Sequence, residues 1–514
     1  MMHRKGPTAG RTTAALAAIL ALAALTSGQA QAQANKVLTI VTPAEPPDLE
    51  PCHSSRAFQG RVVLQNIAET LTFKDPATNA LTPRLATSWE QVDATTWRFK
   101  LRPNVKFHDG APFNAQTLKA SLDRSLDKKL PCGNRTKFFA NMTLEVTPVD
   151  DLTVLLKTDK PSPILPMSMS AMAIGSPNLP PDKPTLQPVG TGPYVMEQWK
   201  AGQEIVLKRN DNYWGPKPQA DGARYIWREE SAVRASMVKI GEADIALNIA
   251  PQEATDKGMD YSYLNSESTY LRIDMSRPPL TDKRVRLALN YAMDREGMRG
   301  TILSKDAIHA TQIVMPSIPG HNHELDKKVR GYDPAMAKKL LAEAKAAGVP
   351  VETEITLIGR PTGYTGAAEV MEAFMTMFKA VGLNVTLKNL EPGQYNEIHN
   401  KPFAENRGPT LLQGTHDNNF GDPIFSYPSK YSCAGSQSML CDKSVDDMVE
   451  KLEGLTGEAR VKAWQEVFRA LYEDVVPEVW MYHMVGFVRV GNRIDFKPDV
   501  TTNAELRIGE IKFK

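Results

Sequence analysis

The sequence has no long hydrophobic run and no excess of charge of one sign. Beyond residue 34, no run of about 18 apolar residues occurs, which is the length that a membrane-spanning helix needs. The 61 lysine and arginine residues are balanced by 59 acidic residues. The chain therefore lacks the basic surplus that attracts nucleic acid or an anionic membrane, and we expect neither as a partner.

Sequence signatures of common enzymes are also absent. The chain has no H-E-x-x-H and no G-x-S-x-G motif, and its Gly190-Thr191-Gly192 stretch lacks the rest of a phosphate-binding loop. No pair of carboxyl groups can be assigned the acid and base roles that a glycosidase needs. We therefore expect a protein that is not an enzyme and that needs no cofactor. A secreted hydrolase is the alternative from another class.

Cysteine is scarce, with four residues in 514: Cys52, Cys132, Cys433 and Cys441. No C-x-x-C spacing supports a metal site. An even number of cysteines in an exported chain favours disulfides, and three pairings are possible. Cys433 and Cys441 lie close together across a loop rich in serine and glycine, so we predict a disulfide between them, with Cys52–Cys132 as the remaining pair.

Histidine is scarce too, at nine residues. His321 and His323 are separated by one residue, close to Pro319-Gly320. A nickel site would need several histidines or a chelating small molecule. Two histidines in a polar loop are more often solvated than bound to metal, so we expect no metal site.

Residues 1–34 have the composition of a secretory signal peptide. A basic start is followed by an apolar run of 12 residues, Ala14 to Leu25, which is too short to span a bilayer. Ala30-Gln31-Ala32 and Ala32-Gln33-Ala34 both fit a cleavage site, and no cysteine for a lipid anchor follows the run. Once these residues are removed, 58 basic and 59 acidic residues remain. We expect an exported protein that is free in the periplasm.

The most informative stretch is residues 85–113, LATSWEQVDATTWRFKLRPNVKFHDGAPF. Apolar residues alternate with charged ones from Trp97 to Leu101, which predicts a strand. Pro103-Asn104 interrupts this strand, and the segment from Val105 to Phe107 is expected to complete a hairpin. Asp109-Gly110 predicts a turn, and Asn114 is placed to cap a helix.

The residue string in this stretch resembles a family signature. W-E-x-x-D, followed by W-x-F-K-L-R-P-N-V-K-F-H-D-G-x-P-F, resembles the family 5 extracellular solute-binding proteins, which are the peptide- and nickel-type binding proteins of ABC importers. G-T-G-P-Y at 190–194 and RNDNYWG at 209–215 are similar to the same family, and the resemblance covers about residues 36–513. It implies an α/β fold of the periplasmic-binding-protein type II kind, with two mixed α/β lobes joined by a hinge plus a third insert domain.

The resemblance also implies a domain organisation and a function. Lobe I would comprise residues 35–74, 186–270 and 485–514, the insert 75–185, and lobe III 271–484. A solute, expected to be a di- or oligopeptide, would be enclosed between lobes I and III by hinge closure and delivered to the permease subunits of an ABC transporter. A non-peptide solute such as an opine, a sugar or a chelated metal is the alternative. The protein is expected to act as a monomer.

A predicted β-α-β unit places the first candidate ligand residues. A strand over 351–358, a helix ending at Gly382 and a strand around 385–389 should form a parallel pair. Ligands of open α/β sheets lie beyond the carboxyl ends of parallel strands, where Arg360 and Tyr364 follow the first strand. The resemblance implies that a basic residue here meets the ligand carboxylate, which suits the guanidinium fork of arginine. A solvated loop arginine is the alternative.

The second candidate stretch runs from Gln413 to Pro423. It resembles the family segment in which an aspartate ahead of an Asp-Pro pair meets the amino group of a peptide, and Asp417 is assigned that role. His416 stands beside it, where the family often has an aromatic residue, and the spacing to Asp422-Pro423 is longer. These departures keep a non-peptide ligand open. Asp422 itself is expected to be a turn residue.

Overall fold

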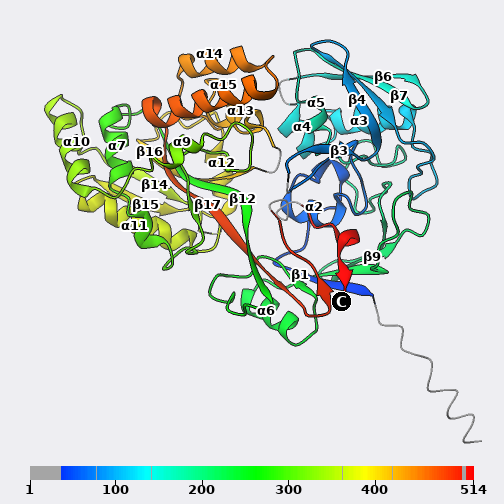
Figure 1. The fold of residues 1–514 in the computed structure, drawn as a ribbon. Helices are drawn as coiled ribbons and strands as arrows, with labels where there is room; N and C mark the ends of the chain where they lie inside the picture. Colours follow the sequence, from blue (N-terminus) through cyan, green and yellow to red (C-terminus); the bar gives the residue numbers. More distant parts are fainter. Residues whose placement is uncertain (1–35, 77, 140–141, 362, 419–420, 500–504) are drawn as a thin grey trace, which may run out of the picture.

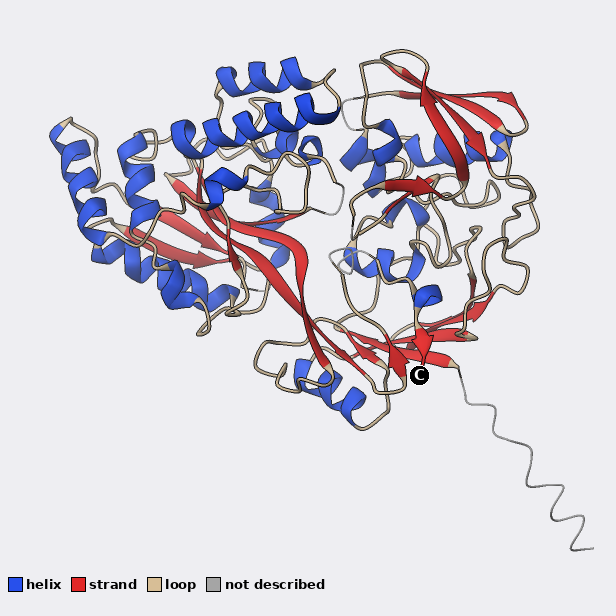
Figure 2. Cartoon of the chain, viewed as in Figure 1, coloured by secondary structure: helices blue, strands red, loops and turns tan. Residues whose placement is uncertain are grey.

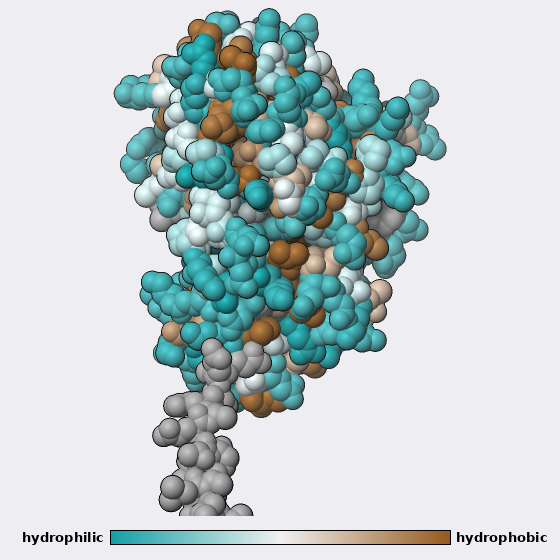
Figure 3. Space-filling view, turned by 90° about the vertical axis from the view of Figure 1, so that its right-hand side faces the viewer, coloured by the Kyte–Doolittle hydropathy of each residue, from teal (hydrophilic) through white to brown (hydrophobic). Residues whose placement is uncertain are grey.

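The computed structural model describes residues 36–514, except 77, 140–141, 362, 419–420 and 500–504. The predicted signal peptide lies outside the described residues. Among the helices that are described, none combines the length and the apolar character needed to cross a membrane. On the face shown in Figure 3, hydrophilic side chains predominate, and apolar ones occur between them in small groups.

One large mixed sheet runs through the whole molecule (Figure 1). Its strands are β1 Val37–Thr42, β8 Tyr194–Lys200, β9 Glu204–Arg209, β10 Gly222–Trp227, β11 Ile245–Ala246, β12 Asp260–Ile273, β13 Ile308–His309, β14 Ile355–Gly359, β15 Val385–Asn389, β16 Thr410–Asp417 and β17 Glu478–Val490. Their order is β15-β14-β16-β12-β17-β11-β1-β10-β9-β8, with β13 paired to β17. We call the part with β1 and β8–β11 lobe I and the part with β13–β16 lobe III.

The long strands β12 and β17 connect the two lobes (Figure 2). They pair antiparallel from Asp260 opposite Arg489 in lobe I to Arg272 opposite Glu478 in lobe III. The pairing slips twice between Leu264 and Tyr270, and Ser266 within this stretch has a φ of 62°. Such irregularities bend a ladder locally, and we refer to this bend between the lobes as the hinge. β17 is one continuous strand from Glu478 to Val490.

Lobe I combines β1 and β8–β11 with the helices α2 Ala57–Val63 and α6 Ser231–Lys239, the short 3-10 helices η2 Pro51–His53 and η6 Ile508–Glu510, and the strands β18 Ile494–Asp495 and β19 Lys512–Phe513. The chain end returns to this lobe, as predicted: Asn66 Nδ2 donates to Leu506 O at 2.7 Å and Ile508 N donates to Asn66 Oδ1 at 3.0 Å. α2 ends at Val63, because Leu64 is extended and Gln65 has a φ of 61°.

A separate four-stranded sheet lies within residues 75–185. Its order is β4 Ala86–Gln91, β5 Thr96–Leu101, β7 Thr153–Thr158 and β6 Leu144–Asp150, accompanied by α3 Ala115–Leu126, α4 Gly133–Phe138, α5 Leu165–Ser168 and the hairpin β2 Thr72–Lys74 with β3 Leu81–Pro83. The predicted cap of α3 is confirmed, because the side chains and backbones of Asn114 and Thr117 bond reciprocally. The predicted hairpin partner is wrong: β5 pairs with β4, whereas Val105 and Phe107 are buried outside any strand.

Lobe III carries most of the helices. They are α7 Lys283–Tyr291, α8 Arg295–Met298, α9 His323–Asp326, α10 Pro334–Ala346, α11 Ala367–Ala380, α12 Pro392–His399, α13 Tyr427–Lys430, α14 Lys443–Leu452, α15 Gly457–Arg469, the 3-10 turn η3 Pro423–Phe425 and the π-helical turn η4 Ala470–Val475. Asp282 and Asp333 cap α7 and α10, and their side chains accept bonds from Arg284 N and Met336 N. β14 and β15 are parallel, as predicted, although β14 begins only at Ile355.

The cysteines divide into one disulfide and two thiols. Cys433 and Cys441 form the predicted disulfide. The predicted Cys52–Cys132 bond is wrong, because both residues are free, and the Cys132 thiol donates to the carbonyl of Cys52 at 3.3 Å. The contact with Cys132 and burial raise the pKa of Cys52. Together with Leu130 the two thiols form a small apolar cluster, which is the usual role of an inert buried cysteine.

Candidate functional site

Two of the predicted site residues come from neighbouring strand ends in lobe III. β14 and β16 are parallel neighbours, with Ile358 opposite Leu412. Arg360 follows β14, and Asp417 is the last residue of β16. The carboxyl ends of parallel strands meet at one edge of a sheet, so the fold brings both side chains to the same edge.

Gln413 holds the first candidate loop in place. This buried residue of β16 accepts a bond from Arg360 N at 2.6 Å with Oε1 and donates one to the Tyr364 hydroxyl at 3.0 Å with Nε2. The hydroxyl of Tyr395 donates to the backbone carbonyl of Gln413 at 2.5 Å. The Arg360 guanidinium lies 5.5 Å from the centre of the Tyr395 ring. Burial raises the pKa of Tyr364, which keeps its hydroxyl neutral. The structure therefore groups Arg360 and Tyr364 around one anchor.

Asp417 points away from its neighbour His416, because successive residues of a strand face opposite sides. The hydroxyl of Ser266 donates to Asp417 Oδ1 at 2.9 Å, and Glu267 of β12 is the residue directly opposite Asp417. The irregular stretch of β12 that was described as the hinge thus contacts the candidate site directly.

His416 lies apart from the other candidates. It is buried, and its Nε2 is 2.5 Å from the hydroxyl oxygen of Ser426. Burial, with the charges of Lys430 and Lys137, lowers its pKa well below the usual value, so the ring is neutral. The structure gives His416 a packing role on the far side of β16 and does not bring it together with Arg360, Tyr364 and Asp417.

Several charged residues at the site were missed from sequence. Burial and Asp417 raise the pKa of Glu267 to about 7, although Arg61 and Arg360 oppose that shift. Burial lowers the pKa of Arg61, against the opposing charges of Tyr263 and Glu267, and its Nη2 donates to Asn248 Oδ1 at 3.1 Å. Arg61 comes from α2 in lobe I, whereas Glu267 lies on the hinge strand and Arg360 in lobe III.

Two lysines extend this charged group across the seam between the lobes. Burial lowers the pKa of Lys74 and of Lys137, and the charge of Asp417 opposes the shift in both. Lys74 ends β2 and Lys137 belongs to α4, so both reach Asp417 from outside lobe III. These two lysines could not be identified from the sequence. Both lie far from Asp417 along the chain, and neither belongs to a motif that indicates a binding site.

Residues that follow Asp417 in lobe III contact α4, Lys74 and Met167 on the other side of the seam. The rings of Phe138 in α4 and Phe425 in η3 meet edge to face with centres 5.2 Å apart. Gly421 has a φ of 74°, and a Cβ on it would lie only 3.1 Å from Lys74 Cδ and 3.2 Å from Met167 Sδ. As predicted, Asp422 is a turn residue: it caps η3 and pairs with Arg460 at 2.8 Å.

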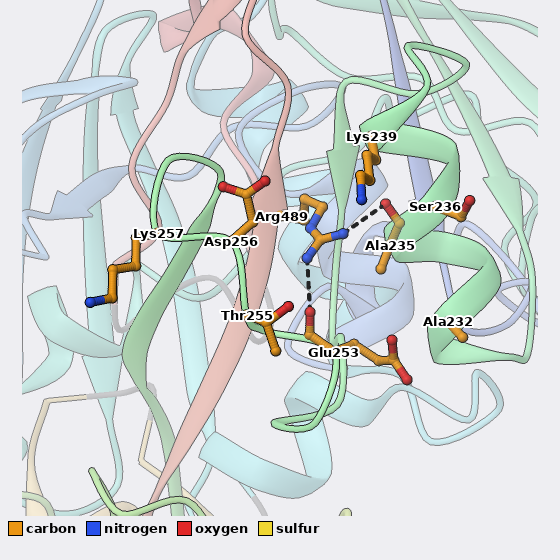
Figure 4. A pocket seen from close by; sticks show the side chains of 9 residues that line it. All are labelled: Ala232, Ala235, Ser236, Lys239, Glu253, Thr255, Asp256, Lys257 and Arg489. Carbon is orange, nitrogen blue, oxygen red and sulfur yellow. Dashed lines mark hydrogen bonds between the residues drawn. The ribbon is translucent and has the colours of Figure 1, made fainter.

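The structure contains a small pocket at this seam and a larger one elsewhere. A crevice lined by Asp417, Asn418, Gly421 and Phe425, among others, has about 180 Å³ of space between its atoms but no room for a water molecule. A pocket of about 550 Å³ lies in lobe I between α6 and the loop before β12 (Figure 4). There Arg489 already pairs with Asp260 at 2.6 Å and donates to the carbonyl of Glu253 at 2.8 Å. Its charge thus serves to hold lobe I together, and we place the candidate site at the seam.

The sequence of the chain is similar to known proteins over most of its length. A profile of the bacterial extracellular solute-binding proteins, family 5 Middle, matches residues 80–438. The dipeptide-binding protein of Escherichia coli K12 is 27% identical over 456 residues, which covers 81% of this chain and 83% of that protein. The glutathione-binding protein GsiB of Shigella flexneri is 29% identical over 318 residues, 59% of each chain.

Solved structures with the same fold include complexes with different ligands. The periplasmic binding protein DppA from Helicobacter pylori in complex with the peptide STSA superposes with a TM-score of 0.77, at 21% identity, over 93% of this chain and 98% of that one. AgaA from A. tumefaciens R10, in complex with agropinic acid, gives a TM-score of 0.77 at 22% identity, over 93% and 99%. These likenesses confirm the predicted α/β fold of the periplasmic-binding-protein type II kind.

Proposed function

The chain belongs to the bacterial extracellular solute-binding proteins of family 5, and from this premise we propose that it captures a peptide between lobes I and III for an ABC importer. Members of this family bind substrates and are not enzymes. The observation that carries the proposal is the mixed charge at the seam, where Asp417 and Glu267 lie with Arg360 and Arg61. A peptide with free termini always offers one cation and one anion, so such a site can pair both ends.

In the proposed complex, Asp417 and Glu267 meet the amino group and Arg360 meets the carboxylate. The guanidinium can donate two parallel bonds to a carboxylate, which fixes its direction. A cleft that closes over the termini must pair them, because an unpaired buried charge costs several kcal/mol. Tyr364 and Tyr395, both held by Gln413, would line the side of this cleft next to Arg360.

We assign residues 35–74, 186–270 and 485–514 to lobe I, 75–185 to the insert and 271–484 to lobe III. Both boundaries between lobes I and III then fall inside the paired strands β12 and β17, close to the register shifts. Closure would be a rotation about this stretch that brings Asp417 against the lysines and the arginine of the other side. The closed protein, exported to the periplasm as a monomer, would then dock on permease subunits.

A second candidate, a non-peptide anion such as an opine, is favoured by one feature of the site. Four cationic side chains, Arg61, Lys74, Lys137 and Arg360, face two carboxylates, Glu267 and Asp417. Since Lys74 also faces Glu505, the surplus is partly compensated. A ligand with net negative charge, including a peptide with an acidic side chain, would fit this surplus best.

Mass spectrometry of the purified protein tests the proposal and separates the alternatives. The protein is isolated from a periplasmic extract, denatured, and its released ligands are weighed; in parallel, unliganded protein is incubated with a mixture of di- to pentapeptides. We expect intact peptides to be released unchanged. Cleaved peptides would instead identify a hydrolase, and a co-purified non-peptide molecule with no peptide bound from the mixture would establish the second candidate.

A further inference from the structure

A cluster of two histidines and one aspartate lies in lobe III, outside the charged seam. His321 precedes the cap of the short helix α9, whose ends are His323 and Asp326. His321 Nε2 is 2.9 Å from Asp326 Oδ2, and His323 Nδ1 is 3.4 Å from the same oxygen. The three potential ligand atoms all lie within 4.8 Å of one another. His321 is buried, whereas His323 is exposed to solvent.

The hydrogen bonds of His321 bring two acceptors, its Nε2 and the Asp326 carboxylate, into contact. Its Nδ1 is 2.9 Å from the carbonyl oxygen of Val314, which can only accept, so Nδ1 carries a hydrogen. In a neutral ring Nε2 then has a lone pair, yet it lies 2.9 and 3.1 Å from the two oxygens of Asp326. A carboxylate is also an acceptor only, so a proton or another cation must hold the two groups together.

The neighbouring groups Thr311 and Gln312 orient the two side chains, but neither supplies a cation between His321 Nε2 and the Asp326 carboxylate. Thr311 Oγ1 donates to Asp326 Oδ1 at 3.2 Å. Gln312 Nε2 is 3.3 Å from His321 Nε2 and also donates to the carbonyl of Asn322 at 3.1 Å. A metal-binding histidine normally donates a hydrogen bond from its other ring nitrogen to a carbonyl or carboxylate, and a metal-binding carboxylate normally accepts a hydrogen bond as well. His321 and Asp326 both have such partners.

We propose that His321 Nε2, His323 Nδ1 and the carboxylate of Asp326 bind a divalent transition-metal ion of the zinc class. Imidazole and carboxylate ligands suit such ions, with bonds of about 2.0–2.2 Å. In a tetrahedral site these bond lengths separate the ligand atoms by about 3.3 Å, close to the spacings seen around Asp326. The exposed ring of His323 gives the ion a path from solvent, and three protein ligands leave one position for water.

The cluster lies next to the hinge strands. The ring centre of His321 is 6.0 Å from that of His483 in β17, and His483 Nδ1 is 2.7 Å from the hydroxyl of Ser268 in β12. Burial, and then the charge of His321, lowers the pKa of His483 to about 3, so this ring stays neutral. The metal ion would therefore bind behind the hinge and apart from the charged seam where the peptide is proposed to bind.

Calorimetric titration of the full mature chain with Zn²⁺ tests the site, with protein that has no histidine tag and has been stripped with a chelator. We expect one ion per chain, and at least tenfold weaker binding in His323→Asn and in Asp326→Asn. Both residues lie at the surface end of the cluster, so the variants should fold, which circular dichroism without metal verifies. His309→Asn is the matched control, because His309 is 3.3 Å from Glu296 in the same lobe but has only that one carboxylate.

The outcomes decide the proposal independently of the peptide. Retained binding in the control, together with the loss in both cluster variants, supports the site. No binding of Zn²⁺ by the unmodified chain would overturn it. Binding that survives both cluster substitutions, or that His309→Asn removes equally, would also overturn it, because the ion would then be held elsewhere.

Discussion

At the scale of single residues, the candidate site is a group of oppositely charged side chains. Some of them could be named from the sequence and others could not. Arg360 could be named as a candidate because it follows a predicted strand, and Asp417 because it lies in a stretch with a family resemblance. Glu267 and Arg61 could not, because they are separated from Asp417 by 150 residues or more and only folding brings them to it. His416, also a candidate ligand residue, lies on the face of β16 opposite to Asp417, because adjacent residues of a strand face opposite sides.

The first prediction concerns the two ends of the ligand. Arg360→Ala and Asp417→Ala should each weaken the binding of a free peptide by about 2–5 kcal/mol, the range for truncating one member of a buried charge pair. Calorimetry with a peptide identified by mass spectrometry measures the effect. Lys388→Ala is the control, because Lys388 is exposed on the neighbouring strand β15.

A blocked ligand makes this test specific. Acetylation of the peptide amine should mimic Asp417→Ala, and the two changes together should cost little more than either alone. If the losses add fully, Asp417 does not contact the amine. If both variants bind undiminished, the ligand lies elsewhere.

The second prediction is a pH dependence that arises at Glu267. Because its pKa is raised to about 7, the carboxyl is largely protonated at pH 6 and ionised at pH 8. The affinity for a peptide with a free amine should therefore rise between pH 6 and 8, while an acetylated peptide shows a smaller change. Glu267→Gln should flatten the profile. A profile that is unchanged in this variant would show that Glu267 does not titrate in the binding step.

The same pKa has the opposite effect on the unliganded fold. A carboxyl whose pKa is higher in the folded than in the unfolded state stabilises the fold below its ordinary range, near pH 4, and this contribution is lost as pH rises through about 7. Relative to Glu267→Gln, the unliganded protein should therefore lose stability between pH 5 and pH 8. Urea unfolding at the two pH values measures the difference, and a constant difference would contradict the assignment.

At the scale of elements, local chemistry predicted helix starts well and strand partners poorly. Asn114 caps α3 as expected, because a cap depends on residues within one turn, and Asp282 and Asp333 cap α7 and α10 in the same way. The partner of β5 was misassigned to the segment Val105–Phe107, which follows it, whereas β5 pairs with β4, which precedes it, and with β7. Such a choice depends on tertiary contacts that alternation in the sequence does not reveal.

The third prediction tests one covalent element of lobe III. The Cys433–Cys441 disulfide closes a short loop, so its removal in the Cys433→Ala/Cys441→Ala double variant should lower the free energy of unfolding by only about 2–3 kcal/mol. Denaturant unfolding measures the loss. Peptide mapping without reductant provides the control, and free thiols at both positions in the exported protein would contradict the prediction.

At the scale of the whole molecule, the large sheet explains how two lobes can act as one binding device. Lobes I and III share β12 and β17, and the irregular pairing near Ser266 lies between Asp417 and the residues of the other side. Motion about this stretch would therefore change the candidate site itself. The overall architecture was predictable only through the family resemblance, because alternation and periodicity identify strands and helices but not which lobe each joins.

The fourth prediction is a thermodynamic consequence of this arrangement. A peptide that binds only the folded chain should stabilise it by about 2.7 kcal/mol at a free concentration one hundred times its dissociation constant. Thermal unfolding with increasing peptide should show a steadily rising Tm, and the rise should be strongly reduced in Asp417→Ala. An equal rise in the variant would mean that the stabilising peptide binds at another surface.

Small-angle X-ray scattering of the unliganded and peptide-saturated protein tests the central claim most directly, namely that lobes I and III close over a peptide. Rotation about the irregular stretch of β12 and β17 should bring the lobes together, so the radius of gyration should fall when peptide is added. Arg360→Ala at the same peptide concentration should remain in the open form. Scattering curves that are unchanged by a peptide whose binding calorimetry has established would contradict closure and with it the proposed mode of capture.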